Sequence, residues 1–303
     1  MIGIAGAGKV GAQAALEIAS EGLDDLALVD IVPGLAEGEA LDISHRLSDA
    51  GVDVEVTGST DFATLKGASL VVIAAGLGRK PGMTRMDLLS KNSGIIASVT
   101  KEVAKNAPDS VLLMVTNPMD AMTYVALKAS GFPKGRVVGQ GGVLDNSRFK
   151  YVLAKKLGVS RGSITSLVMG EHGENMIPVA SHTYISGVPL SSLLSDEEVL
   201  QAIDDTRKVA AEVISKKGAT IFAPGRSVAR MATAISRDTK EVLAASAYLE
   251  GEYGLSGLCI GVPVKLGKAG IEQIYEVKLS DRERDWFNKG ADALREAISS
   301  LAV

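Results

Sequence analysis

The residue best suited to proton transfer in this sequence is His172, in the segment MGEHGE. Histidine moves protons near neutral pH because its ordinary pKa is about 6.5. The flanking glycines give close access to its ring at the expected end of a strand. A histidine that serves only the fold would have the same local pattern, so its surroundings must decide. The two other histidines, His45 and His182, are interpreted as structural.

A carboxylate and a guanidinium follow at helical spacing in the segment LDNSR. Asp145 and Arg148 are three residues apart and share one face of the expected helix, so an ion pair within the helix is one interpretation. The other interpretation divides their roles: Asp145 holds the imidazole of His172 and favours its charged form, while Arg148 binds a carboxylate through two hydrogen bonds. The sequence leaves both open.

A glycine-rich turn of the form G-x-G-x-x-G follows the first expected strand and opens a helix. Gly6 permits a tight turn, Gly8 lets the backbone approach a pyrophosphate, and Gly11 packs the helix on the strand. The helix N-terminus adds amide N–H groups and the positive end of its dipole. The predicted cofactor-binding segment is Gly6, Ala7, Gly8, Lys9, Val10 and Gly11.

Asp30 is the acidic partner that this motif requires, at the end of the second expected strand. A carboxylate there accepts hydrogen bonds from the adenosine ribose and repels a 2′-phosphate. The next three residues, IVP, include no arginine, so NAD is favoured over NADP. In the alternative interpretation Asp30 only caps a loop and the glycines only turn the chain.

The segment LGRKPGMTRM, residues 77–86, follows the fourth expected parallel strand and carries Arg79, Lys80 and Arg85. Ligands of parallel sheets bind beyond the carboxyl ends of the strands, where this loop must lie. Its proline and glycine predict a hinged flap. The alternative is a solvated basic surface.

Asn117 follows another expected strand, in the segment TNP. Asn-Pro after a strand is normally a turn. The amide would also suit a polar group placed over a cofactor ring, across a cis peptide. Both interpretations stay open.

The composition favours an α/β enzyme with many tight turns, since the chain has 33 glycines and only 4% aromatic residues. The chain has 303 residues, 46% hydrophobic and 22% charged, which excludes a disordered or fibrous protein, and its net charge of −4 leaves no basic surplus for nucleic acid. No apolar run approaches the roughly 18 residues of a membrane span. A strand begins at Ile2, so no signal peptide is expected. The single cysteine, Cys259, excludes an internal disulfide, and we expect a cytoplasmic protein.

Apolar strands alternate with helical patterns in the first half, which predicts a Rossmann domain over residues 1–142: a doubly wound parallel sheet covered on both faces. The expected strands are 1–5, 26–30, 52–57, 69–75, 111–116 and 136–139, and the expected helices 10–20, 35–49, 87–106 and 119–130. The pattern then changes to an α+β catalytic domain over residues 143–303. Its expected helices are 144–157, 196–217, 228–235 and 281–301, and its strands 164–169, 178–185, 242–249, 259–266 and 273–279, the last three antiparallel.

With these residues in place, the sequence resembles the lactate/malate dehydrogenase family, most closely its tetramer-type, lactate dehydrogenase-like malate dehydrogenases. The resemblance covers essentially the whole chain. Its blocks occur in the family's order and spacing: GAGKVG with LVD, RKPGMTR, DLLSKN, VTNPMD, LDNSR, GEHGE, KGATIFAP, YLEGEYG and IGVPVKLGKAGIEQI.

The resemblance implies NAD as cofactor and (S)-malate, oxidised reversibly to oxaloacetate, as substrate, with no metal. It implies a set of further NAD contacts near the nicotinamide end, which are Asn92, Val115, Thr116 and Asn117. It also implies a homodimer or homotetramer. The alternatives are an L-lactate or broader 2-hydroxyacid dehydrogenase and, outside enzymes, a non-catalytic NAD-binding module.

The same resemblance implies how the substrate is handled. His172 is the proton-transfer residue, Asp145 is its partner, and Arg148 clamps the carboxylate next to the reacting carbon. Arg85 swings in with the loop and polarises the carbonyl oxygen. Arg79 pairs with the second carboxylate of oxaloacetate, and Asn117 also contacts the substrate.

The sequence departs from the family pattern at two places. Arg226 stands where relatives tend to have a small residue; a contact between subunits is one interpretation of it, and no role is assigned. Ala244 and Ala245 stand near where relatives wall the substrate pocket, which bears on fine specificity and leaves the reaction unchanged.

Overall fold

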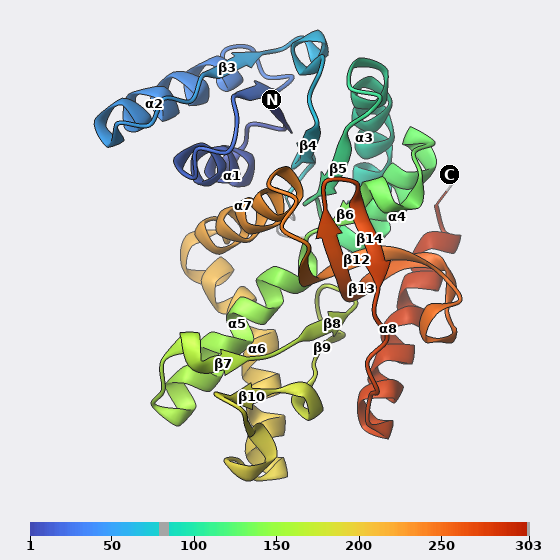
Figure 1. Cartoon of the computed structure of the whole chain (residues 1–303). Coiled ribbons are helices and arrows are strands. Elements are labelled where there is room, and N and C mark those ends of the chain that lie inside the picture. Colours follow the sequence, from blue (N-terminus) through green and yellow to red (C-terminus); the bar gives the residue numbers. More distant parts are fainter. Residues whose placement is uncertain (79–84, 302–303) are drawn as a thin grey trace.

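The N-terminal part of the chain folds into a parallel sheet (Figure 1). The computed structural model describes residues 1–78 and 85–301, while residues 79–84, residues 302–303 and the side chain of Arg85 lie outside the description. In the described part the strand order of this sheet is β3-β2-β1-β4-β5-β6, all parallel. The strands are β1 (Ile2–Ala5), β2 (Leu26–Val29), β3 (Val56–Ser59), β4 (Leu70–Ile73), β5 (Val111–Met114) and β6 (Val137–Gly139).

Helices cover both faces of this sheet. They are α1 (Lys9–Ser20), α2 (Leu35–Ala50), α3 (Arg85–Asn106) and α4 (Met119–Ser130), joined by α7 (Phe222–Ser236), which packs on α1. Alternate residues of a strand point to opposite faces. In β4, Leu70 and Val72 pack in the cluster that holds α1 and α7, whereas Val71 and Ile73 pack in the cluster that holds α3 and α4. Burial of both faces explains the continuous apolar runs, and the predicted doubly wound fold is confirmed.

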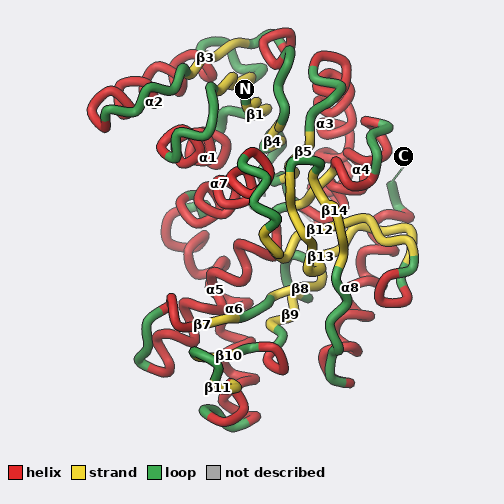
Figure 2. The backbone as a smooth tube through the Cα atoms, viewed as in Figure 1, coloured by secondary structure: helices red, strands yellow, loops and turns green. Residues whose placement is uncertain are grey.

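The C-terminal part is α+β, as predicted, and its strands extend the same sheet. β6 pairs with β12 through Gly139 and Ser246, β12 pairs with β13 along most of its length, and β13 pairs with β8 and β14, all antiparallel. Figure 2 shows β8 and β9 below this pair and a small separate sheet of β7, β10 and β11 at the lower end of the molecule. The strands are β7 (Ile164–Thr165), β8 (Val168–Gly170), β9 (Met176–Pro178), β10 (Tyr184–Ile185), β11 (Val188–Pro189), β12 (Glu241–Glu250), β13 (Ser256–Gly267) and β14 (Gly270–Ile274). The remaining helices are α5 (Gly141–Leu157), α6 (Asp196–Lys217) and α8 (Asp281–Ser299).

Two strand predictions in the C-terminal part were too long. The expected strand 164–169 is two strands, β7 and β8, in different sheets, and 178–185 is the end of β9, a 3-10 turn over Ala180–His182, and β10. Pairing explains the break: β9 follows β8 only as far as the Val168–Pro178 pair. Period-two patterns do not reveal where a chain changes its partner.

Three boundaries differ from the predicted ones. β3 starts at Val56 rather than 52, since its register begins opposite Leu26, and the amide of Val52 instead bonds to the Leu47 carbonyl at the end of α2. β14 covers 270–274 rather than 273–279, because Gly270, at φ +88°, turns the chain directly into the strand. α7 begins six residues before the expected 228, since Pro224 in its first turn needs no amide hydrogen bond.

None of the helices in the described part of the chain has an apolar stretch long enough to span a bilayer.

The last parallel strand, β6, ends at Gly139, and α5 begins at Gly141, three residues before the expected start. The Gly141-Gly142 pair is inside the helix. A Cβ on Gly141 would lie 2.8 Å from the Cβ of His172, and one on Gly142 would lie 2.6 Å from the Cβ of Ala244. The glycines therefore allow α5 to pack closely on the segments around it.

Candidate active site

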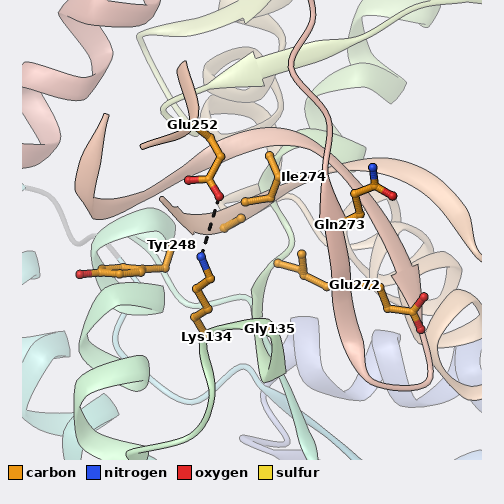
Figure 3. A pocket seen from close by; sticks show the side chains of 9 residues that line it. Lys134, Gly135, Tyr248, Glu252, Glu272, Gln273 and Ile274 are labelled. Carbon is orange, nitrogen blue, oxygen red and sulfur yellow. Dashed lines mark ion pairs between the residues drawn. The ribbon is translucent and has the colours of Figure 1, made fainter. Parts of the chain in front are cut away.

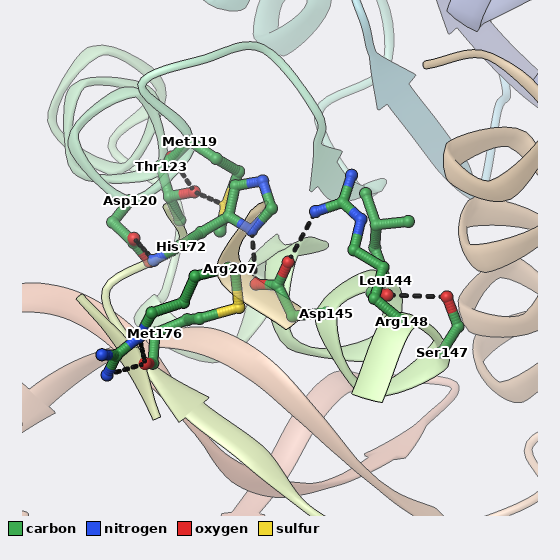
Figure 4. Close-up of polar contacts among 10 residues, drawn as sticks. All are labelled: Met119, Asp120, Thr123, Leu144, Asp145, Ser147, Arg148, His172, Met176 and Arg207. Carbon is green, nitrogen blue, oxygen red and sulfur yellow. Dashed lines mark hydrogen bonds and ion pairs between the residues drawn. The ribbon is translucent and has the colours of Figure 1, made fainter. Parts of the chain in front are cut away.

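A histidine, a carboxylate and a guanidinium from two segments form a buried chain of contacts (Figure 4). His172 follows β8, and its Nδ1 lies 2.6 Å from Oδ2 of Asp145 in the first turns of α5. The other carboxylate oxygen, Oδ1, accepts a hydrogen bond of 2.9 Å from Arg148 one turn later. Asp145 therefore makes both contacts that sequence reasoning treated as alternatives: the intrahelical ion pair and the contact with the imidazole.

Burial makes these contacts strong. The Asp145 side chain is 2% exposed, that of Arg148 10% and that of His172 12%. Burial alone would lower the pKa of His172, but the charge of the Asp145 carboxylate and its hydrogen bond outweigh it, so the pKa of His172 is raised above its ordinary value. Arg148 opposes this rise, and Asp120 adds to it. The arrangement favours an imidazolium next to a carboxylate.

Arg148 keeps capacity for a further anion. Among the described residues its guanidinium donates only to Asp145. Its other N–H groups can still bind a carboxylate in the planar, two-bond manner of guanidinium groups. A titratable imidazole and a guanidinium are thus joined through one buried carboxylate.

The glycine turn has the geometry of a phosphate-binding loop. Gly6 has φ +101°, and a Cβ there would lie 2.4 Å from the Ala75 amide nitrogen, while one on Gly11 would lie 1.8 Å from the Gly6 carbonyl oxygen. By contrast, no atom comes within 4 Å of a Cβ placed on Gly8. Gly8 is the N-cap of α1 and has no side chain that could accept a hydrogen bond from the first turn. The backbone amides of this turn, which starts with Lys9 and Val10, are therefore not capped by a side chain. The turn is therefore packed closely against the protein at Gly6 and Gly11 and open at Gly8.

Asp30 lies against this turn. Its Oδ2 accepts a hydrogen bond of 2.8 Å from the Ala7 amide, and its Oδ1 accepts one of 2.9 Å from the Val32 amide. The carboxylate at the end of β2 is therefore held beside the turn at the end of β1. A dinucleotide whose pyrophosphate lies on Gly8 would bring its adenosine ribose toward this side.

Asn92 joins the two segments that follow β4 and β5. It is fully buried in α3; its Oδ1 accepts from the Leu77 amide at 2.8 Å, and its Nδ2 donates to the Leu77 and Asn117 carbonyls. The peptide between Asn117 and Pro118 is cis. Thr116 donates to the Ala75 carbonyl at 2.6 Å, so it supports the same junction, while Asn117 itself is exposed and Val115 half-buried. The described contacts of Asn92 are thus to the backbone at the carboxyl ends of the strands.

Other predicted residues lie elsewhere or outside the description. Arg79 and the side chain of Arg85 are not among the described residues. His45 is exposed on α2, and His182 contacts the Ser181 hydroxyl. Arg226 forms an ion pair with Glu21 at the end of α1, which gives it a partner within the chain. In the described part no group of three His, Cys, Asp or Glu side chains is arranged to hold a metal ion.

A cavity of about 250 Å³ lies apart from the histidine, between the 3-10 turn before β6 and the strands β12 and β14 (Figure 3). Lys134 points into it and forms an ion pair with Glu252 at 3.8 Å. None of the predicted site residues lines this cavity. It does not change the location of the candidate site.

Sequence reasoning missed Asp120. Its Oδ2 accepts a hydrogen bond of 2.7 Å from the backbone amide of His172, 52 residues away (Figure 4). The partner is a backbone group, so no residue type marks the contact in the sequence. The sequence offers two weak signals: an acidic residue in the first turn of a helix, which is a common feature of helices, and its place at the end of the VTNPMD block.

Comparisons with known proteins agree with this geometry. Residues 1–139 match the lactate/malate dehydrogenase, NAD binding domain model, and residues 142–302 match the lactate/malate dehydrogenase, alpha/beta C-terminal domain model. A protein of Thermoproteus tenax named malate dehydrogenase is 46% identical over 303 residues, with 99% of this chain and 98% of that protein covered.

Two solved structures from Cryptosporidium parvum are also similar. Its malate dehydrogenase has a TM-score of 0.96 at 37% identity, and the match covers 99% of this chain and 98% of the malate dehydrogenase chain. Its lactate dehydrogenase, complexed with lactic acid and nicotinamide adenine dinucleotide, has a TM-score of 0.95 at 34% identity. That match covers 98% of this chain and 96% of the lactate dehydrogenase chain. Because the two scores are nearly equal, the fold alone does not separate the two substrates.

Proposed function

The chain belongs to the lactate/malate dehydrogenase family, as its motifs predicted, and on that premise we propose that it is a malate dehydrogenase. It oxidises (S)-malate to oxaloacetate reversibly, with NAD as cofactor. The observation that carries this function is the buried His172–Asp145–Arg148 chain of contacts at 2.6 and 2.9 Å, in a protein whose N-terminal domain is an NAD-binding domain. The names of its relatives favour malate over lactate.

The residues present fit NAD. Gly8 leaves open the side of the turn on which a pyrophosphate would lie, and Asp30 stands beside it for the ribose hydroxyls. Asn92 keeps the junction between residues 77 and 117 in place, where Val115, Thr116 and Asn117 would line the nicotinamide end. Bound NAD supplies the hydride acceptor in malate oxidation and the hydride donor in the reverse direction.

The chain's own residues handle the proton and the charges. In malate oxidation neutral His172 takes the proton of the substrate hydroxyl at Nε2, because Nδ1 faces Asp145. In the reverse direction the imidazolium, stabilised by Asp145, donates that proton to oxaloacetate. Arg148 holds the carboxylate next to the reacting carbon. Arg85 would polarise the reacting oxygen, and Arg79 would bind the second carboxylate.

The first test compares substrates. NADH oxidation is followed by absorbance with oxaloacetate and, in parallel, with pyruvate at equal concentration. Rapid turnover of oxaloacetate with little of pyruvate is the expected result. Faster turnover of pyruvate would contradict malate dehydrogenase activity and favour the lactate alternative, and turnover of neither would favour a non-catalytic NAD-binding module.

Replacing Arg79 by glutamine is expected to reduce the preference for oxaloacetate over pyruvate by roughly 10- to 100-fold. Removing one cation leaves the second carboxylate of oxaloacetate unpaired in a closed site, and an unpaired buried charge costs about 1–3 kcal/mol or more. The measurement is the ratio of kcat/KM for the two substrates. Arg46→Gln, exposed on α2, is the matched control and should keep the ratio. An unchanged ratio in Arg79→Gln would remove Arg79 from the substrate site.

Replacing Gly11 by alanine is expected to weaken NADH binding by at least about tenfold. The new methyl group would lie 1.8 Å from the Gly6 carbonyl oxygen, so the turn must move, and overpacking of this kind costs about 1–3 kcal/mol. NADH fluorescence titration measures the affinity, and thermal unfolding measures the stability. Gly38→Ala in α2 is the control, because no atom comes within 4 Å of its Cβ. Wild-type affinity in Gly11→Ala would contradict the assignment of the turn.

The remaining assignments are proposals of the same kind. We divide the chain into an NAD-binding domain over 1–142 and a catalytic domain over 143–303, and we place the protein in the cytoplasm as a homodimer or homotetramer. A single buried cysteine, Cys259, suits a reducing compartment. Light scattering after size exclusion distinguishes a monomer from either oligomer.

A further inference from the structure

Asp120 is a second buried carboxylate beside His172. It is 2% exposed in the first turn of α4, and its Oδ2 accepts the hydrogen bond of 2.7 Å from the His172 amide (Figure 4). Its other oxygen, Oδ1, is buried without a hydrogen-bond partner among the described residues. A buried carboxylate with one unpaired oxygen destabilises the folded protein, because burial disfavours its charged form.

The segment that carries His172 needs such an anchor. Gly170 and Gly173 on either side have φ values of +86° and +142°, so the backbone leaves the strand geometry of β8 here. The hydrogen bond with Asp120 ties the backbone of His172 to α4, and the contact with Asp145 ties its ring to α5. Two carboxylates from two helices thus hold one residue, one at its backbone and one at its ring.

We propose that Asp120 is a positioning residue for His172, and that its buried charge acts together with that of Asp145 to stabilise the imidazolium. The proposal rests on the proposed function, since it assigns Asp120 to the proton-transfer step of that reaction. Asp120 does not touch the substrate in this assignment. It fixes where the ring stands and how readily the ring holds a proton.

The charged and titratable groups around Asp120 agree with this role. Asp145 and Arg148, on α5, act electrostatically on His172. Ser246 lies beside Asp120 on β12, and the charge of Asp120 raises the pKa of the Cys259 thiol on β13. Burial raises the pKa of Asp120 to about 6, while the Ser246 hydroxyl, which lies nearby but makes no hydrogen bond of normal geometry, and the hydrogen bond from the His172 amide oppose the rise. At neutral pH the carboxylate is therefore still mainly charged. Its charge raises the pKa of His172 in the same sense as that of Asp145.

The test reads the pKa of His172 directly. The chain has three histidines, so NMR titration of ¹³C-labelled imidazole rings can be assigned with single His→Asn variants. In Asp120→Asn the amide oxygen can still accept from the His172 backbone, but the charge is gone. We expect the pKa of His172 to fall by about one pH unit in this variant. The titration needs no substrate, so it stays informative even if malate turnover were absent and the proposed function failed.

A second variant separates position from charge. Asp120→Ala removes the hydrogen bond as well, and we expect kcat to fall by about tenfold beyond the effect of Asp120→Asn, because the ring is no longer held in place.

Thermal stability should be kept or raised in Asp120→Asn, since a carboxylate whose pKa is raised on folding destabilises the folded protein at pH above that value. A purely structural role would instead lower stability in both variants.

Glu283→Gln is the matched control. Glu283 is also a buried carboxylate, but its hydrogen bonds go to Ser181, in the 3-10 turn before β10, and to Ser280 at the start of α8. We expect this variant to lose stability without moving the pKa of His172. The proposal is overturned if Asp120→Asn leaves the pKa of His172 at its wild-type value, or if kcat is the same in Asp120→Ala as in Asp120→Asn.

Discussion

Replacing His172 by asparagine is expected to lower kcat for malate oxidation by about 10³-fold while NADH affinity stays at its wild-type value. General acid–base catalysis by a positioned side chain contributes about 10²–10⁴-fold, and asparagine cannot carry a proton between substrate and solvent near neutral pH. Asparagine can still donate a hydrogen bond to Asp145, so the buried carboxylate keeps a partner. The loss should therefore appear in the chemical step and leave the folded structure intact.

Initial rates with malate and NAD, together with a fluorescence titration of NADH, measure the two quantities. His182→Asn is the control, because His182 contacts the Ser181 hydroxyl and takes no part in the His172–Asp145 contact. It should keep kcat within about twofold. Near-wild-type turnover in His172→Asn would mean that another group moves the proton.

The fold was largely readable because the parallel sheet is buried on both faces. Strands such as β4 and β5 carry four consecutive buried apolar residues, and no solvent-facing position interrupts the run. Errors arose where a strand's partner or a packing contact sets the boundary. The start of α5 is an example: it was expected at 144, whereas the helix begins at Gly141, where a Cβ would lie 2.8 Å from the Cβ of His172.

The candidate site was readable to the level of residue types. His172, Asp145 and Arg148 were identified as a group, but two pairings for Asp145 remained open because helical spacing supports one and a long-range contact the other. A carboxylate has two oxygens, and the fold uses one for each partner. Spacing along the sequence cannot show that two interpretations are compatible in space.

Contacts with the backbone were beyond reach of the sequence. Asp120 accepts a hydrogen bond from the amide of His172, and Asn92 donates hydrogen bonds to the carbonyls of Leu77 and Asn117. Every residue except proline offers the same backbone amide, so such partners carry no residue-type signature. The family resemblance did assign a role to Asn92, and the structure adds that its described hydrogen bonds go to backbone groups.

Asp145→Asn is expected to lower kcat for oxaloacetate reduction by about 10²–10³-fold at neutral pH. The asparagine amide cannot satisfy both neighbours: turned one way, its NH₂ group donates to Nδ1 of His172, which keeps that nitrogen unprotonated and disfavours the imidazolium that reduction requires. Turned the other way, the NH₂ group faces the Arg148 guanidinium, donor against donor. Either orientation also leaves Arg148 without its counter-charge in a buried site.

The pH dependence gives the sign of the effect. The pKa of His172 is raised in the folded protein because the Asp145 carboxylate outweighs burial. Its contribution to stability is therefore fully present below the ordinary pKa of histidine and is lost as the pH rises through the raised value. Reduction of oxaloacetate needs the imidazolium and fails over the same rise in pH. Without the carboxylate, burial dominates, the pKa of His172 falls, and the activity for reduction should disappear at lower pH.

Rates of oxaloacetate reduction across pH, with thermal midpoints at the same pH values, test this expectation. Asp292→Asn is a close control, because Asp292 pairs with Arg295 at the same spacing of three residues and the same 2.9 Å distance, yet on the exposed surface of α8. Exposed pairs contribute about 0–1 kcal/mol, so this variant should keep both the rate and its pH profile. If Asp145→Asn moved the pH profile no further than Asp292→Asn, Asp145 would be an ordinary ion-pair residue of α5, and the charge that raises the pKa of His172 would have to come from elsewhere.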